Sequence, residues 1–191
     1  MNKIWNGKLS GLLSFLIIVL KIILLKINIK INTFLFVTNI NKCGRKILIM
    51  PGVIYRYPQK INFNNNIIIG RNTTFFSEIA SSTGLFLQDN VSIGENCNID
   101  FSGGLIIRKN VHLAHNVLIS THDHGYDYRN SPVGKSLDIC ENVFIGSHSI
   151  IMHNVSIIGA NSVIGSGAVV TKDVPPNCII AGNPAKIIKY I

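Results

Sequence analysis

The sequence predicts a mainly β protein: a left-handed parallel β-helix with an apolar helix before it and a short helix after it. Three observations predict this fold. Aliphatic residues recur every six positions between residues 87 and 170, and small or turn-compatible residues, above all Gly and Asn, follow many of them. The period of six fits neither an α-helix nor a coiled coil, whereas three six-residue faces complete one triangular coil. A long apolar run occupies the N-terminal end.

The composition is that of one folded domain with a short appendage. The 191 residues are 47% hydrophobic and 14% charged, which excludes a disordered chain. Four cysteines are scattered without a C-x-x-C pair, namely Cys43, Cys97, Cys140 and Cys178. Neither a zinc ribbon nor a disulfide framework is indicated, so we expect free thiols in a reducing compartment.

The net charge of +9 belongs to the front of the chain. Residues 1–77 contain 11 Lys and Arg but no Asp or Glu, while the rest holds 7 basic and 9 acidic residues. This asymmetry predicts an anionic partner for the N-terminal part. Aromatic residues are not interleaved with the basic ones and no nucleic-acid motif appears, so we expect a membrane surface and no nucleic acid.

Residues 1–45 are predicted to form an apolar, basic membrane-associating segment, and residues 46–191 the β-helix domain with its tail. The uncharged stretch between Lys8 and Lys21 has 12 residues, fewer than the roughly 20 that cross a bilayer. No small-x-small cleavage site follows, which disfavours a signal peptide. A membrane span and packing on the protein's own body remain alternatives. We favour a cytoplasmic protein held peripherally on the inner face of a bacterial plasma membrane.

The six-residue period places aliphatic side chains inside the coils. Four in-phase runs carry it: Leu87, Ile93 and Ile99; Ile107, Leu113 and Ile119; Ile139, Ile145, Ile151 and Ile157; Ile164 and Val170. Asn tolerates the left-handed backbone that the corners need, and its side chains can stack in ladders. After the coils, Asn183 and Pro184 can cap and start a helix over residues 185–191.

The breaks in the period indicate where function lies. Eight positions separate Ile99 from Ile107, and seven separate Ile157 from Ile164. Twenty separate Ile119 from Ile139, and this insertion contains the text T-H-D-H-G-Y-D-Y-R-N. A solenoid accommodates an insertion by looping it out of one edge, where binding and catalytic residues often lie.

Three stretches resemble the hexapeptide-repeat acyltransferases, in particular the sugar O-acetyltransferases of the maltose, galactoside and nodulation type. They are N-V-H-L-A-H-N-V-L-I-S-T-H-D-H-G-Y-D (110–127), E-N-V-F-I-G-S-H (141–148) and V-I-G-S-G-A-V-V-T-K-D-V-P-P-N-C-I-I-A-G-N-P-A-K (163–186). The resemblance implies transfer of acetyl from acetyl-CoA to a sugar hydroxyl, less readily an amine, in cell-surface polysaccharide or glycolipid biosynthesis. It also implies a homotrimer with the acyl-CoA slot between neighbouring chains, and no metal.

The resemblance further implies that a His in the long insertion is the general base. A neutral imidazole can accept the proton of an acceptor hydroxyl, which is otherwise a poor nucleophile. Alignment without gaps from Asn110 makes His124 the base, and a two-residue gap makes it His122. We favour His124, with His122 shaping the acceptor pocket. Asp100, in the first break, is a candidate contact for the acceptor.

Other matched positions imply the cofactor site. Phe144 stands where the family has a Trp near the reacting groups, and the backbone at Ser147 would lie near the thioester carbonyl. Pantetheine and the CoA phosphates would contact the remaining matched positions, which are Ser166, Thr171, Lys172 and Lys186. Lys186 stands where relatives often have Arg, so a single ammonium charge replaces the forked hydrogen-bond donors of a guanidinium group.

Two rival functions are considered. A gamma-class carbonic anhydrase-like enzyme would bind zinc through His148 and His153, five apart, and His112, 36 residues before His148. However, His112 and His148 differ in phase, and we expect these three and His115 to be exposed on the coils. A non-enzymatic β-helix scaffold would need neither the long insertion nor the CoA-type C terminus.

Overall fold

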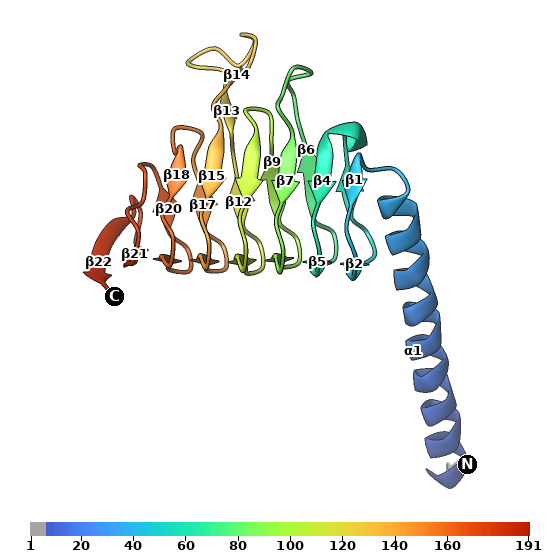
Figure 1. Cartoon of the computed structure of the whole chain (residues 1–191). Coiled ribbons are helices and arrows are strands. Elements are labelled where there is room, and N and C mark those ends of the chain that lie inside the picture. The colour runs from blue at the N-terminus through green and yellow to red at the C-terminus, as the bar shows by residue number, and fades with distance from the viewer. Residues whose placement is uncertain (1–6) are drawn as a thin grey trace.

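The computed structural model describes residues 7–191 as one long helix followed by a parallel β-helix (Figure 1). The helix, α1, comprises Gly7–Val37. Parallel strands then stack on three flat faces, which we call A, B and C. Face A holds β1 (Lys42–Cys43), β4 (Ile61–Phe63), β7 (Leu85–Leu87), β10 (Leu105–Ile107), β15 (Leu137–Ile139) and β18 (Ile157–Ile158).

Face B contains β2 (Ile47–Ile49), β5 (Ile67–Ile69), β8 (Ser92–Ile93), β11 (His112–Leu113), β16 (Phe144–Ile145), β19 (Val163–Ile164), β21 (Cys178–Ala181) and β22 (Lys186–Tyr190). Face C contains β3 (Ile54–Tyr55), β6 (Thr74–Phe76), β9 (Asn98–Asp100), β12 (Leu118–Ile119), β17 (Ile150–Ile151) and β20 (Val169–Val170). A 3₁₀ turn, η1 (Pro58–Lys60), precedes β4, and a small antiparallel hairpin joins β13 (His122–Asp123) to β14 (Val133–Gly134).

The interior of the coils is filled by the residues that the six-residue period predicts. Of the predicted series, all but Ile157 are at most 1% exposed. The prediction that Ile157 points inward is wrong. Its side chain is 41% exposed, and Ile158 occupies the interior position instead. The extra residue therefore lies between Ile151 and Ile158, and a shift of one residue turns a strand side chain to the opposite face. The four cysteines are free thiols, as expected.

The edge between faces A and B, which we call the ladder edge, is held by stacked asparagines. These residues have φ between 56° and 62°, and each side-chain amide donates to the next at 2.8 to 3.0 Å: Asn66, Asn90, Asn110, Asn142, Asn161 and Asn177. At the edge between B and C, a Cβ on Gly70 or Gly94 would lie 2.4 or 2.6 Å from the next coil's backbone. The residue types at both edges are therefore restricted, to Asn by the stacked hydrogen bonds and to Gly by the close approach of the next coil.

The insertions gather at the third edge, between faces C and A, which we call the loop edge. The irregular segments at this edge include residues 76–84, 100–104, 120–136 and 152–156. The longest contains the β13–β14 hairpin, which projects beyond the coils (Figure 1). Because successive coils are in register, loops far apart in sequence lie one above another at this edge.

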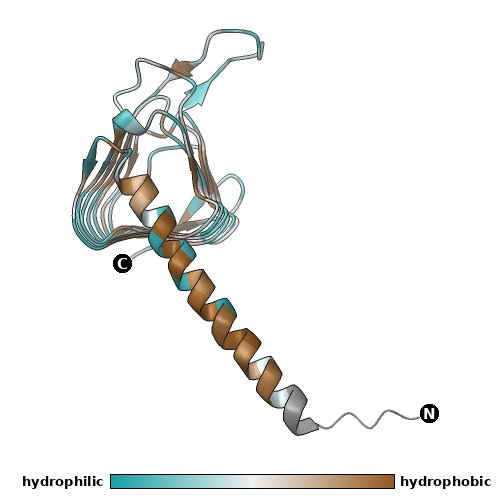
Figure 2. Ribbon diagram, turned by 90° about the vertical axis from the view of Figure 1, so that its right-hand side faces the viewer, coloured by the Kyte–Doolittle hydropathy of each residue, from teal (hydrophilic) through white to brown (hydrophobic). Residues whose placement is uncertain are grey.

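The last turns of α1 close the first end of the β-helix. Phe36 is 2% exposed, and its ring stacks on Phe63 with centroids 5.4 Å apart and meets Tyr55 edge-on at 4.6 Å. The Thr33 hydroxyl oxygen accepts the amide of Ile49 at 3.0 Å. The rest of α1 extends past the body, on the side away from the hairpin (Figures 1 and 2).

The predicted C-terminal helix is wrong. After β21 the chain reverses at Gly182, where φ is +96°, and returns as β22, antiparallel to β21. The unpaired edge of β21 offers backbone hydrogen-bonding groups, and the text K-I-I-K-Y suits a strand. Pairing with a neighbouring strand therefore outweighs the local signals for a helix start at Asn183 and Pro184.

Candidate active site

Strand register brings three loops together at the loop edge. Phe76 pairs with Asp100 at the ends of β6 and β9, and Ile99 pairs with Ile119 one coil further on. The side chains just beyond these strand ends therefore stack. Glu78, Ser102 and His122 follow the strand ends of three successive coils and so lie near one another. The Glu78 amide donates to Ser102 Oγ at 2.7 Å.

A buried carboxylate holds one of the two candidate histidines. Asp100 is 1% exposed, and its Oδ2 lies 2.8 Å from Nδ1 of His122. Oδ2 also accepts the amide and hydroxyl of Thr121, while Oδ1 accepts the amide and hydroxyl of Ser102. Asp100 thus has almost no free surface for an acceptor, and its position favours orienting the His122 ring over the acceptor contact that the sequence suggested.

The second candidate histidine lies beside the first and is more exposed. The His122 and His124 rings meet edge to face with centroids 5.3 Å apart, and their side chains are 11% and 28% exposed. Nδ1 of His124 donates to the carbonyl of Asn130 at 2.7 Å. This hydrogen bond, assisted by Glu78, raises the pKa of His124 above its ordinary value.

Glu78 connects the two rings. Its Oε2 lies 3.3 Å from Nε2 of His124 and 3.6 Å from Nε2 of His122. His124 also borders a cavity of about 480 Å³, together with Lys135 and His153. The arrangement places a candidate proton acceptor, a buried orienting carboxylate and an open recess at one edge of the molecule.

The predicted cofactor residues do not meet the histidines within one chain. Phe144 projects from face B, where its ring stacks on His112 with centroids 5.6 Å apart. Ser147 and Ser166 lie at the edge between faces B and C. Thr171 and Lys172 lie at the loop edge, and Lys186 starts β22. The structure therefore divides the predicted site between separate edges.

The three histidines of the carbonic anhydrase alternative are also separated within the chain. His112 lies on face B, His148 at the edge between B and C, and His153 at the loop edge. His148 contacts Asn116 at 3.4 Å, and His153 faces Asp123 at 3.5 Å. As expected, His112, His115 and His148 are exposed, whereas His153 is half-buried.

Sequence reasoning missed Glu78, although two signals pointed to it. It is the first acidic residue after an acid-free stretch of 77 residues. It also lies where the aliphatic series skips one position, because the interior residues Phe75 and Leu87 stand twelve positions apart and Ser81 lies midway between them. The predicted aliphatic series begins only at Leu87, after this gap. Thr121 and Ser102 could be found only from the register.

Comparison with known proteins agrees with the fold and with the family resemblance. No family model matches the chain. Galactoside O-acetyltransferase of Escherichia coli K12 is 34% identical over 151 residues, which are 78% of this chain and 63% of that enzyme. The chain resembles hexapeptide-repeat acetyltransferases. This confirms the resemblance drawn from the sequence, over less than two thirds of the relative's length.

Solved structures of such acyltransferases show the same fold. AntD, an N-acyltransferase from Bacillus cereus solved with dTDP and coenzyme A, superposes with a TM-score of 0.70 at 19% identity, covering 80% of this chain and 84% of that one. A hexapeptide-repeat acetyltransferase from Vibrio cholerae with acetyl-CoA gives 0.53 at 24% identity, covering 82% and 74%. At these identities the likeness concerns the fold alone, and it confirms the predicted β-helix class.

Proposed function

We propose that the protein is an acetyl-CoA-dependent acetyltransferase acting on a sugar hydroxyl, in cell-surface polysaccharide or glycolipid biosynthesis. The observation that carries the proposal is the hydrogen-bonded pair of Asp100 and His122 at the loop edge. It supplies an oriented base within the same insertion that resembles the active-site loop of sugar O-acetyltransferases. The similarity to galactoside O-acetyltransferase supports a sugar acceptor.

We further propose that His122 is the base, although the ungapped alignment favours His124. An ionised carboxylate only accepts hydrogen bonds, so Asp100 fixes the proton of His122 on Nδ1 and leaves the lone pair on Nε2. Nε2 takes the proton of the acceptor hydroxyl as its oxygen bonds to the acetyl carbon. The same proton can then pass to the departing sulfur of coenzyme A. Asp100 also stabilises the imidazolium that forms between these two steps.

An assay of acceptors tests the proposed activity. Labelled acetyl-CoA would be incubated with the protein and a panel of sugars, nucleotide-sugars and amino-sugars. We expect label on a sugar as an ester that hydroxylamine removes, because a hydroxyl is the proposed acceptor. A label stable to hydroxylamine would instead indicate an amide, as expected of an enzyme such as AntD, an N-acyltransferase solved with an amino-sugar nucleotide. Transfer to none of these sugars would contradict the proposal.

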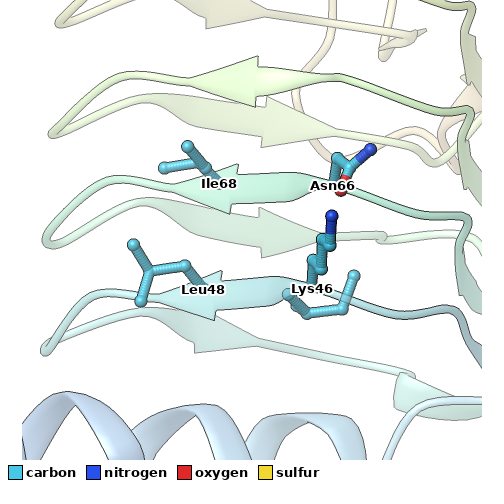
Figure 3. A pocket seen from close by; sticks show the side chains of 5 residues that line it. Lys46, Leu48, Asn66 and Ile68 are labelled. Atoms are coloured by element: carbon cyan, nitrogen blue, oxygen red, sulfur yellow. The ribbon is translucent and has the colours of Figure 1, made fainter.

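We also propose a homotrimer, because one chain does not assemble the site. Phe144 and Ser147 lie away from the loop edge, and a neighbouring β-helix packed alongside would bring one chain's loop edge to another's cofactor edge. Exposed apolar side chains on the flat faces give such packing a driving force. Leu48 and Ile68, side by side on β2 and β5 in Figure 3, are 38% and 46% exposed, and Phe144 is 41% exposed.

Light scattering of the purified protein tests the trimer. We expect three chains per particle. On dilution, the rate of acetyl transfer per chain should decrease in parallel with the fraction of trimer. Fully active monomers at micromolar concentration would show instead that one chain contains the whole site.

The projecting part of α1 supports membrane attachment, which we propose is on the cytoplasmic side. By length and composition Gly11–Val37 could cross a membrane, and its most apolar stretch is not buried in the molecule. The ribbon of the projecting helix is mostly brown, or hydrophobic, in Figure 2, and exposed residues such as Leu13, Ile17 and Leu24 belong to it. A helix that is apolar all round needs an apolar environment. We propose that this part embeds in the membrane, with Lys26 and Lys30 near anionic headgroups.

A further inference from the structure

Three metal-ligating atoms converge at the loop edge. His122, His124 and Glu78 each offer one ligand atom, and these three atoms lie within 4.8 Å of one another. They come from two separate insertions, residues 76–84 and 120–136, that the register of the coils brings together. Two imidazoles and a carboxylate are the ligand types that zinc and related divalent ions bind.

The hydrogen bonds on the far side of each ring fix which nitrogen has a lone pair. His124 donates Nδ1–H to the Asn130 carbonyl, which can only accept. His122 donates Nδ1–H to Asp100. In the neutral rings the lone pairs are therefore on the two Nε2 atoms, which are the nitrogens that lie near the Glu78 carboxylate. A carboxylate or carbonyl behind each ring is the usual support of a metal-bound histidine.

The spacing also suits a tetrahedral ion. Bonds of about 2.0 to 2.1 Å to nitrogen and oxygen imply ligand atoms about 3.4 Å apart. The distances from Glu78 Oε2 to the two Nε2 atoms are 3.3 and 3.6 Å. The Glu78 side chain is 43% exposed, so solvent can reach the cluster and supply a fourth ligand.

We infer that His122, His124 and Glu78 form a binding site for a divalent transition-metal ion such as Zn²⁺, and that the bound ion inhibits the protein. The inhibition rests on the proposed function, since the ion would occupy the Nε2 lone pair that the base requires. The site itself does not depend on that function. Metal and acceptor proton compete for one nitrogen, which makes the acetyl transfer sensitive to zinc.

Calorimetry with ZnCl₂ on the full-length protein tests the site. We expect one ion per chain, with affinity falling at least about tenfold in Glu78→Gln and in His124→Ala. His153→Ala is the matched control, because His153 also faces a carboxylate at the same edge, Asp123 at 3.5 Å. It should bind zinc as the unaltered protein does. With Co²⁺, the visible spectrum should show a tetrahedral site without thiolate charge transfer.

Two outcomes would overturn the site: no stoichiometric zinc binding, or binding that Glu78→Gln and His124→Ala leave unchanged. The thermal unfolding of each variant is measured alongside, so that a misfolded variant is recognised. Zinc binding without inhibition would keep the site but contradict His122 as the base. If the unaltered protein transfers acetyl but does not bind zinc, the proposed metal site is contradicted and the proposed function is not.

Discussion

Replacing His122 by alanine is expected to lower kcat by about 10² to 10⁴ and to leave the KM for acetyl-CoA almost unchanged. The reason is that Asp100 holds the His122 ring with Nε2 free, whereas the acetyl-CoA contacts are expected elsewhere. His124→Ala should have a smaller effect, mainly on the KM for the acceptor, because His124 borders the cavity beside the hairpin. Steady-state kinetics with the sugar identified in the acceptor assay would measure both.

The opposite pattern would show that the ungapped alignment was right and His124 is the base. The pH profile gives a second test. The hydrogen bond to Asn130 raises the pKa of His124, so His124 becomes neutral, and able to accept a proton, only at higher pH. If it were the base, the rising limb of kcat would lie above the ordinary imidazole value of about 6.5. Near-normal turnover in both variants would contradict the mechanism.

Deleting residues 1–30 is expected to release the protein from membranes while leaving the β-helix folded and turnover of a soluble acceptor largely intact. The deletion removes the projecting, apolar part of α1 but keeps Thr33, Phe36 and Ile40, which contact the first coil. Flotation with vesicles containing anionic lipid would measure the release, and circular dichroism would measure the thermal unfolding. Vesicle binding that survives the deletion would contradict the proposed anchor.

Point variants within the retained turns provide the contrast. Phe36→Ala should destabilise the fold by about 3 to 5 kcal/mol, because it leaves a cavity among the rings that close the coil. Phe34→Ala, at a residue 65% exposed, should change stability by no more than about 0.5 kcal/mol. Loss of cooperative unfolding in the deletion itself would show that more of α1 belongs to the core than these contacts indicate.

The repeat could be predicted from the sequence because each interior position is determined locally. An aliphatic residue that is one place out of phase would point outward, so the spacing of the aliphatic residues identifies the interior positions of the coils. Ile157 was misassigned because two isoleucines stand together and the period alone cannot choose between them. The strand at residues 186–190 was missed for another reason: its partner, β21, provides hydrogen bonds that local helix signals do not reveal.

The candidate site was only partly predictable because it depends on contacts between coils. The insertion with His122 and His124 was evident from the broken period. The contact that favours His122 was not, since it comes from Asp100, more than twenty residues earlier in the chain but one coil away in space. Glu78 reaches the same point from a coil still earlier. Such neighbours follow from knowing how many residues each turn of the coil contains, which the insertions obscure.

The closure of both ends bears on how the protein avoids polymerising. A bare terminal coil would present unpaired strand edges, on which a second molecule could continue the stack into a fibre. α1 lies across the first coil, and Phe36 fills the opening that another molecule would need. At the other end β22 is the outermost strand of face B, where Lys186 and Lys189 put charge along the edge. Variants that lose either closure are therefore candidates for end-to-end aggregation, independently of any effect on acetyl transfer.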